Sequence, residues 1–434
     1  MRVGVVGGGI TGLSLLHHLR ERGVDATLFE ASEAPGGVIR TTERDGRVIE
    51  HGPQRLRLSE PVERLVAALG LEEELVVADD DLPLYVYADG ALRRVPRSVR
   101  GFLRTDLLSI RGKLRVLAEP LTAPGRPDET AAEFFARKFG DEAYERLLGP
   151  VFGGMYASDP TRMPVRHSLT TVLGLEDRAG SLLRAALSRL GEETPPPASF
   201  VDGLQRLPRA LADAHADRVS LDTPVTGIGE DGNGHVLETS EGDQPVDRVV
   251  VTVAADAAAS LLDRVAPDAA EALAGLTYNP LALVHLRSDA DPTGFGYQVS
   301  RETALRTLGV TWNASLFGPE ASGGERAATG RSGVFTAFLG GMADPDVLDR
   351  DDEALGGLAA EEFAEVMDAK ADVLNVTRLP RGFPAYDDSW DALDDLVLQP
   401  GIELATNYTA RMGIPSRVRE AGELAERLAR EAGQ

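Results

Sequence analysis

The sequence predicts an α/β chain, α+β overall, and three observations lead to this fold class. A glycine-rich loop follows a short apolar strand near the N-terminus, a helical pattern covers about 57–190, and short alternating strands recur beyond it. The chain has 434 residues, of which 43% are hydrophobic. It can therefore bury a large core, and we expect two or three domains.

The first elements predict a Rossmann-like beginning. Residues 2–6 (RVGVV) have the composition of a buried strand, and the apolar spacing that follows predicts a helix ending at Gly23. Residues 25–30 predict a second strand. This order of strand, helix and strand is typical of a nucleotide-binding βαβ unit.

The later elements follow from changes in the pattern along the chain. The helical stretch ends before three prolines at 195–197, which mark a boundary. Beyond them the sequence predicts, in order, short strands within 199–263, alternating strands within 277–342, a helix at about 353–370, a short strand at 402–406 and a final amphipathic helix at roughly 415–432.

The loop after the first strand carries the spacing Gly7-x-Gly9-x-x-Gly12. Gly7 allows a tight turn, Gly9 lets the backbone approach a pyrophosphate, and Gly12 allows close packing of helix and strand. Glu30 ends the second strand, where its carboxylate can accept hydrogen bonds from a ribose diol and would repel a 2′-phosphate. The motif therefore predicts a dinucleotide other than NADP.

A second glycine pair, Gly36 and Gly37, follows soon after Glu30, and Arg40 comes next. Such a pair can bring another backbone segment close to the pyrophosphate, with which Arg40 could pair. Together with the first motif, these residues resemble the FAD-binding signature of the glutathione-reductase-like flavoproteins. The predicted cofactor is therefore FAD.

Longer segments extend this resemblance over essentially the whole chain. GGGITGL with the later PGG and HGPQ (51–54) resembles the amine-oxidase superfamily of flavoproteins, and other segments are similar to its protoporphyrinogen oxidase family. These segments are ADGALRRVP (88–96), TDLLSIRGKLR (105–115), GPVFGGMYASDPTRMPV (149–165), SFVDGLQRLPRAL (199–211), TPVTGI (223–228), GFGYQ (294–298), SLFG (315–318), FLGGMADP (338–345) and ATNYTARMGIPSRV (405–418).

The resemblance implies a three-part molecule. The expected parts are an FAD-binding domain made of 1–57, 196–265 and 385–434, an inserted helical domain at 58–195 that faces substrate and membrane, and a mixed-sheet substrate domain at 266–384. It also implies oxidation of a porphyrinogen to a porphyrin with loss of six electrons and six protons. Hydride would pass from a meso carbon to flavin N5, and oxygen or another acceptor would reoxidise the flavin. No catalytic side chain is expected, because the cofactor carries the chemistry.

The resemblance assigns site residues position by position. The expected cofactor-binding residues are Gly7, Gly9, Ile10, Thr11, Gly12, Glu30, Gly36, Gly37, Arg40, Val225, Asn407, Met412, Gly413 and Ile414. The expected substrate-binding residues are Phe295, Gly296, Gln298, Thr311, Phe338 and Arg411. Phe295 and Phe338 could equally be ordinary packing residues of strands.

Some positions depart from the family pattern. Leu84 stands where the animal and plant enzymes have an arginine that pairs with a substrate propionate, and Gln298 and Thr311 are polar. Arg411, at a position that is usually glycine, is one candidate for a replacement anchor. The more polar pocket leaves coproporphyrinogen III as an alternative to protoporphyrinogen IX. Further alternatives are an amine oxidase or desaturase of the same superfamily, and a flavoprotein that binds without turnover.

The charge of the chain limits its partners. With 69 acidic and 45 basic side chains, the net charge is −24, which disfavours binding to nucleic acid. Lysine occurs only at Lys113, Lys138 and Lys370. Excess carboxylate with little lysine favours adaptation to concentrated salt, although a GC-rich genome would also favour arginine over lysine. We therefore expect a halophilic protein.

Other composition features exclude further classes of site. The chain has no cysteine, which excludes disulfides and thiolate metal sites. The seven histidines, including the adjacent His17 and His18, show no metal-binding spacing, so no metal is expected. We expect a cytoplasmic protein, since no signal peptide or membrane span is evident. The apolar, basic segment 101–121 fits a packed amphipathic helix, which we favour, or peripheral membrane contact. Nothing in the sequence fixes the oligomeric state.

Overall fold

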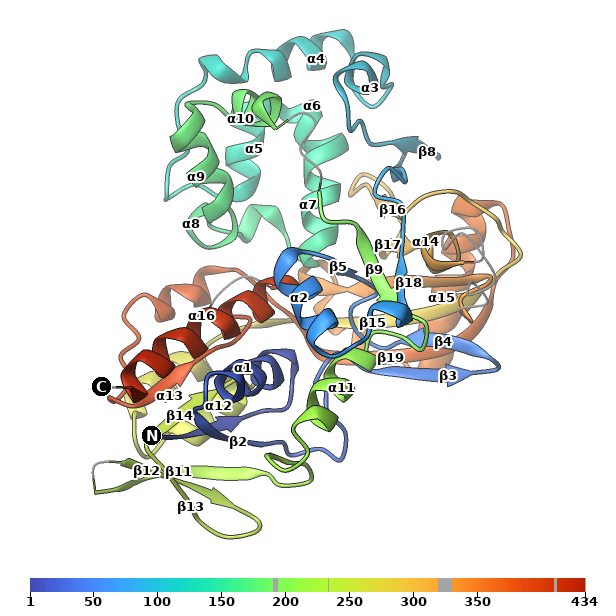
Figure 1. The fold of residues 1–434 in the computed structure, drawn as a ribbon. Helices are drawn as coiled ribbons and strands as arrows, with labels where there is room; N and C mark the ends of the chain where they lie inside the picture. The colour runs from blue at the N-terminus through green and yellow to red at the C-terminus, as the bar shows by residue number, and fades with distance from the viewer. Residues whose placement is uncertain (190–193, 233, 319–329, 410–411, 434) are drawn as a thin grey trace. The chain divides into compact units, whose positions relative to one another are not determined.

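The computed structural model describes residues 1–189, 194–232, 234–318, 330–409 and 412–433. The chain forms two compact units (Figure 1). Unit 1 combines residues 1–78, 195–276 and 391–434, and unit 2 combines residues 79–194 and 277–390. Each unit is therefore built from segments that are far apart in the sequence.

Unit 1 is built on a parallel sheet of five strands. Their order is β10 (Val219–Ser220), β2 (Asp25–Phe29), β1 (Arg2–Val6), β14 (Arg248–Val251) and β20 (Ile402–Leu404). The central strand β1 has buried apolar residues on both faces, as expected for a strand covered on both sides. The strand order reverses between β2 and β14 on either side of β1, which is where open parallel sheets bind nucleotides.

Helices cover one face of this sheet. Helix α1 (Ile10–Glu21) packs beside α16 (Ile414–Ala432) and α11 (Arg206–Ala214), and its leucines form a core with those of α2 (Glu60–Ala68) and α16. Figure 1 shows α1 in dark blue next to α16 in red. Helices α12 (Ala255–Leu262) and α13 (Pro267–Ala274) follow β14.

Three small sheets complete unit 1. They pair β11 (Val225–Asp231), β12 (Gly234–Thr239) and β13 (Gln244–Val246); β3 (Thr41–Arg44) and β4 (Arg47–Glu50); and β5 (Leu56–Arg57), β9 (Pro197–Phe200) and β6 (Leu75–Val77). A Cβ on Gly4 would lie 2.6 Å from Leu237, so β12 packs directly against β1.

Unit 2 contains a mixed sheet of seven strands. Their order is β19 (Asp372–Pro384), β15 (Tyr278–Arg287), β18 (Val334–Gly340), β17 (Thr307–Thr311), β16 (Gly296–Val299), β7 (Leu84–Ala88) and β8 (Ala91–Arg94). Helix α15 (Asp352–Met367) covers one face, where Leu355, Ala359 and Phe363 join a core with the sheet. The short helix α14 (Asn313–Phe317) follows β17.

The other helices of unit 2 lie between residues 99 and 188. They are α3 (Val99–Arg104), α4 (Ile110–Leu117), α5 (Ala131–Phe139), α6 (Asp141–Ala143), α7 (Gly149–Tyr156), α8 (Val165–Ser168), α9 (Thr170–Ala179) and α10 (Leu182–Ser188). Lys138 of α5 is buried between the carboxylates of Glu119 and Glu176, which ties three segments of this region together. Within the described residues, no helix has both the length and the apolar content needed to cross a bilayer.

The structure confirms the α/β class and the Rossmann-like beginning, but it differs from the sequence prediction between residues 58 and 94. The helical pattern was expected to cover this stretch, whereas β6, β7 and β8 lie within it. Strands β6 and β7 pair with β9 and β16, which are more than 100 residues away. Residues 58–78 belong to unit 1 because Val62, Leu65 and Val66 enter its core. The five-segment domain division stays a prediction.

Candidate functional site

The glycine loop of unit 1 turns sharply between β1 and α1. Gly7 has a φ of 111°, which favours glycine, and its N–H donates to the Phe29 carbonyl at 2.9 Å. The Thr252 hydroxyl donates to the carbonyls of Val6 at 2.9 Å and Gly7 at 3.0 Å. The turn is thus fixed from β2 on one side and from the end of β14 on the other.

The three motif glycines differ in the space around them. A Cβ on Gly12 would lie 2.1 Å from the Gly7 carbonyl oxygen, so the protein itself requires glycine there. No atom lies within 4 Å of a Cβ placed on Gly9, the residue that caps the N-terminus of α1. Ile10 and Thr11 form the first turn of α1 and are buried. The open space at Gly9, at a helix N-terminus, fits the approach of a pyrophosphate.

The second glycine pair lies directly against the first motif. The Gly36 N–H donates to the Gly8 carbonyl at 2.8 Å, and Gly9 and Gly36 form an isolated parallel bridge. A Cβ on Gly37 would lie 3.4 Å from the Gly9 Cα. The two glycine segments, predicted to cooperate, therefore meet at one place.

Glu30 lies at the end of β2 beside this loop. Its Oε2 accepts from the Gly8 N–H at 2.5 Å, and its Oε1 accepts from the Ser32 N–H at 2.9 Å. Its carbonyl accepts from the N–H of Thr223, two residues before Val225, so the half-buried Val225 at the start of β11 is held near the end of β2. The carboxylate is half-buried, and its role as a ribose ligand stays a prediction.

Arg40 and the C-terminal segment complete the predicted cofactor set. Arg40 is exposed, and its carbonyl accepts from the His51 N–H at 2.8 Å. Burial lowers the pKa of His51, and the charge of Arg40 lowers it further. Arg40 therefore places a positive charge near the His51 ring.

In the C-terminal segment, Asn407 and Met412 are half-buried, and Gly413 has a φ of 105° and precedes the buried Ile414 of α16. The hydroxyl of Tyr408 donates to the Val253 carbonyl at 3.2 Å, next to the residue that holds Gly7. All the described residues predicted to bind the cofactor lie in unit 1.

Four predicted substrate residues share one face of the unit 2 sheet. Gln298 pairs with Gly309, which pairs with Phe338, and Gly296 pairs with Thr311. Cross-strand partners point to the same face, and so do residues two apart in a strand. The alternate residues, such as Tyr297, Val310 and Phe335, pack on the other face with α15. Helix α7 covers part of this face, since Gly154 lies directly against Gln298.

Local packing accounts for some of the residues on this face. The Gln298 Oε1 has no hydrogen-bond partner among the described residues and lies where Cβ atoms on Gly154 and Gly309 would stand. Phe338 is half-buried and packs on Leu283. Gly296 has a φ of 131°, and a Cβ there would meet the Val310 carbonyl at 2.0 Å, so the sheet alone requires this glycine.

The remaining predicted substrate residues are placed differently. Phe295 precedes β16 and is 7% exposed, and the Arg97 guanidinium lies 6.0 Å from its ring centre. Leu84 is half-buried in β7 opposite Gly296. Arg411 lies outside the described residues.

Sequence reasoning missed a pocket of about 240 Å³ in unit 2. It is lined by α7, by the connection between β16 and β17, and by the end of β18, and it contains Arg301 and Arg306. Arg301 pairs with Asp159 at 2.7 Å, and Arg306 pairs with Asp344 at 2.8 Å. Arg350 also pairs with Asp344, at 3.4 Å, so three guanidinium groups face two carboxylates.

The sequence offered one signal for Arg301 and Arg306, which is that they are basic residues close to the GFGYQ segment. Their carboxylate partners are far away in the sequence or lie in another loop. Burial acts to raise the pKa of Asp159, but hydrogen bonds from Arg301 and Thr161 lower it to about 2. Asp159 is therefore ionised near neutral pH and balances the charge of Arg301. The Glu362 carboxylate, which accepts from the Arg306 and Thr307 N–H groups, adds a third acidic group beside the arginines.

Comparisons with known proteins identify the family that the chain matches. The sequence model for flavin containing amine oxidoreductase matches residues 10–432. Chloroplastic protoporphyrinogen oxidase 1 of Spinacia oleracea is 31% identical over 88% of this chain and 74% of its own. Coproporphyrinogen III oxidase of Bacillus subtilis is 26% identical over 88% of this chain and 87% of its own. A crystal structure of a candidate protoporphyrinogen oxidase from Exiguobacterium sp. 255-15 has a TM-score of 0.80 at 25% identity, with 99% of both chains covered.

Proposed function

The chain belongs to the flavin-containing amine oxidoreductase family and is an FAD-dependent oxidoreductase, and we propose that its reaction is the oxidation of protoporphyrinogen IX to protoporphyrin IX. The similarity to the spinach enzyme supports this substrate, because it extends over most of the chain. The proposed electron acceptor for the reduced cofactor is oxygen or another oxidant.

One structural observation in this chain supports the proposed substrate. Gly296, Gln298, Thr311 and Phe338 lie on one face of a single sheet, although they come from three strands spread over more than 40 residues. A shared face of this kind presents a broad surface with an aromatic ring. A tetrapyrrole is a large ligand, puckered as the porphyrinogen because its meso carbons are sp3 and flat as the porphyrin product. The opposite face is filled by the core with α15 and offers no such surface.

The role of the chain's own residues would be positioning. When bound, FAD supplies a hydride acceptor, so no nucleophile or general base is needed at the sheet. Phe338 and Thr311 would orient the ring of the substrate, and the buried surroundings would keep water away from it. In unit 1, Glu30 and the glycine loops would hold the cofactor's ribose and pyrophosphate.

Coproporphyrinogen III is a second candidate substrate, and the arginine pocket favours it. This substrate carries four propionates, whereas protoporphyrinogen IX carries two. Arg301 and Arg306 lie in a pocket at the end of the same strands, β16 and β17, that bear Gln298 and Gly309. Such a pocket would receive carboxylate arms that a −24 surface repels at low ionic strength.

We also propose peripheral contact with a membrane through α3 and α4. Six of the twelve large apolar side chains that are exposed in the described residues lie between 99 and 121: Val99, Leu103, Ile110, Leu114, Leu117 and Leu121. The exposed Arg100, Arg104 and Arg111 lie in the same segment. The sequence favoured a packed helix here, and this exposure favours the alternative.

A fluorescence assay tests the reaction. Protoporphyrinogen IX and coproporphyrinogen III, which do not fluoresce, are supplied separately in high salt to protein of known FAD content. We expect porphyrin fluorescence to appear faster than in a protein-free autoxidation control, with a larger kcat/KM for protoporphyrinogen IX. A larger value for coproporphyrinogen III would select the second candidate.

Anaerobic reduction of the bound flavin distinguishes the proposed reaction from an amine oxidase and from a flavoprotein without turnover. Bleaching by a porphyrinogen but not by candidate amines would agree with the proposal. Bleaching only by an amine would identify an amine oxidase. Flavin binding without any porphyrin formation above the autoxidation rate would indicate a binding protein and contradict the proposal.

A further inference from the structure

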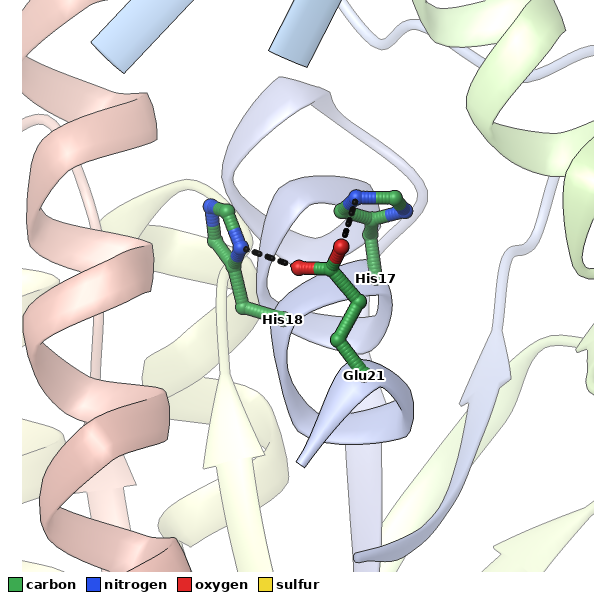
Figure 2. Close-up of side chains that lie close together, drawn as sticks. All are labelled: His17, His18 and Glu21. Carbon is green, nitrogen blue, oxygen red and sulfur yellow. Dashed lines mark hydrogen bonds and ion pairs between the residues drawn. The ribbon is translucent and has the colours of Figure 1, made fainter. Parts of the chain in front are cut away.

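We infer that helix α1 carries a binding site for a divalent transition-metal ion, with His17, His18 and Glu21 as its ligands. The sequence showed no metal-binding spacing, because His17 and His18 are adjacent and the other histidines are scattered. The structure brings the two rings to the same carboxylate, as Figure 2 shows. This inference is independent of the proposed reaction.

The distances match those between metal ligands. Glu21 Oε1 lies 3.5 Å from His17 Nε2, and Glu21 Oε2 lies 3.3 Å from His18 Nδ1. Two ligands of a tetrahedral zinc ion, each about 2.0–2.1 Å from the metal, are about 3.3 Å apart. The three potential ligand atoms all lie within 4.8 Å of one another, so small rotations of the rings close the site.

A third histidine orients the first ligand. His17 Nδ1 lies 3.1 Å from His215 Nε2, at the end of α11. Metal-bound histidines usually hydrogen-bond through their second ring nitrogen, which fixes the tautomer. With the proton on Nδ1 shared with His215, the lone pair of His17 Nε2 is directed toward Glu21.

Charges of both signs lie near the cluster. The guanidinium groups of Arg22 and Arg64 are close to His18 and oppose a bound cation. The Glu21 carboxylate, with 49% of its side chain exposed, and the net charge of −24 favour a bound cation.

The ligand chemistry limits the ion. Two imidazoles and one carboxylate suit Zn²⁺, Co²⁺, Ni²⁺ or Cu²⁺ and do not suit Ca²⁺ or Mg²⁺, which prefer oxygen ligands. The exposed carboxylate leaves the remaining coordination positions to water. A bound ion would cross-link side chains of α1 only, and the contact between His17 and His215 would link the site to the end of α11, which packs on α1.

Zinc titration of the untagged holoprotein tests the inference by calorimetry. We expect one Zn²⁺ per chain, with affinity at least about tenfold weaker in His18→Ala and in Glu21→Gln, because each loses a ligand. His215→Ala should weaken binding by about 10- to 100-fold, since it removes only the orienting partner. Asp217→Asn is the matched control, because it removes a nearby negative charge that is not a ligand.

A second readout separates binding from folding. Added Zn²⁺ should raise the unfolding temperature of the wild type and of Asp217→Asn, but not that of Glu21→Gln, whose half-exposed side chain is replaced without a change of volume. Equal zinc affinity in wild type, His18→Ala and Glu21→Gln would overturn the assignment. So would the absence of stoichiometric binding in the wild type.

Discussion

At the residue scale, Gly9 and Gly12 are glycines for different reasons: the fold requires Gly12, whereas Gly9 leaves space for the cofactor. Gly12→Ala places a Cβ against the Gly7 carbonyl and should destabilise the protein, whereas Gly9→Ala meets no atom within 4 Å. Gly9 has an ordinary φ of −74°, so alanine adds no backbone strain. We therefore expect Gly9→Ala to fold with an apoprotein unfolding temperature close to that of the wild type, but to contain much less FAD.

Flavin absorbance per chain and thermal unfolding of the apoproteins measure this contrast. Gly23→Ala serves as the control. Gly23 has a φ of 75° and lies far from the loop in sequence, so this change should strain the backbone without affecting FAD content. If Gly9→Ala purified with a full complement of FAD, the proposed pyrophosphate position would be wrong.

Asp159 gives a pH prediction at the same scale. Its folded pKa of about 2 is lower than the roughly 3.9 of an unfolded aspartate, so its ion pair with Arg301 stabilises the folded state above that value. This stabilisation is lost as the pH falls from about 4 to about 2. Asp159→Asn should therefore be less stable than the wild type at pH 6, and the difference should shrink below pH 4.

Urea unfolding at a series of pH values measures the difference between the two proteins. Asp243→Asn, at an exposed position, should track the wild type throughout. A gap between wild type and Asp159→Asn that stays constant from pH 6 down to the acid limit would show that the carboxylate's charge contributes nothing.

The sequence identified some site residues and could not identify others. The spacing of Gly7, Gly9 and Gly12 is local, so a motif reveals it. Arg301 pairs with an aspartate 142 residues away, and His215 reaches His17 across 198 residues. Contacts of this kind depend on how distant segments pack, and no local pattern encodes them.

At the scale of elements, periodicity predicted the helices better than the strands. The expected helices at about 353–370 and 415–432 correspond to α15 and α16, because each carries its own apolar face. Periodicity did not predict strand β7, whose hydrogen-bond partner β16 lies about 200 residues further on. The strength of a strand comes from such partners, which the local sequence does not contain.

The α3–α4 segment carries the prediction for membrane contact. Ile110 is 79% exposed within the apolar, basic segment 99–121, and Val397 is equally exposed outside it. Burying a large apolar side chain in lipid yields about 1.5–3 kcal/mol, so Ile110→Ser combined with Leu121→Ser should weaken vesicle binding at least about tenfold. Val397→Ser should bind vesicles as the wild type does.

Co-sedimentation with vesicles that contain anionic lipid, at high salt, measures this binding. High salt screens the repulsion between the acidic chain and the lipid, so the assay reports mainly on apolar insertion. Wild-type protein that stays in the supernatant at all lipid concentrations would contradict membrane contact through this segment.

At the scale of the whole molecule, the net charge of −24 predicts a dependence on salt. Lysine is nearly absent, and one of the three lysines, Lys138, is buried between two carboxylates, so it does little to offset the surface charge. Charges on the surface repel one another over a Debye length of about 10 Å at 0.1 M salt and about 3 Å at 1 M. The folded state, which concentrates these charges, should therefore be much less stable at low salt.

Thermal unfolding in KCl from 0.1 to 2 M tests this, with sucrose as an uncharged control that favours compact states without screening. We expect the unfolding temperature to rise with KCl much more than with sucrose. Replacing the exposed Glu241, Asp243 and Asp395 by lysine cuts the net charge by a quarter and should reduce the rise. A wild-type protein that is as stable at 0.1 M KCl as at 2 M would refute salt adaptation. The arginine excess would then reflect genome composition, and the arginine pocket would have to attract an anionic substrate without the help of screening.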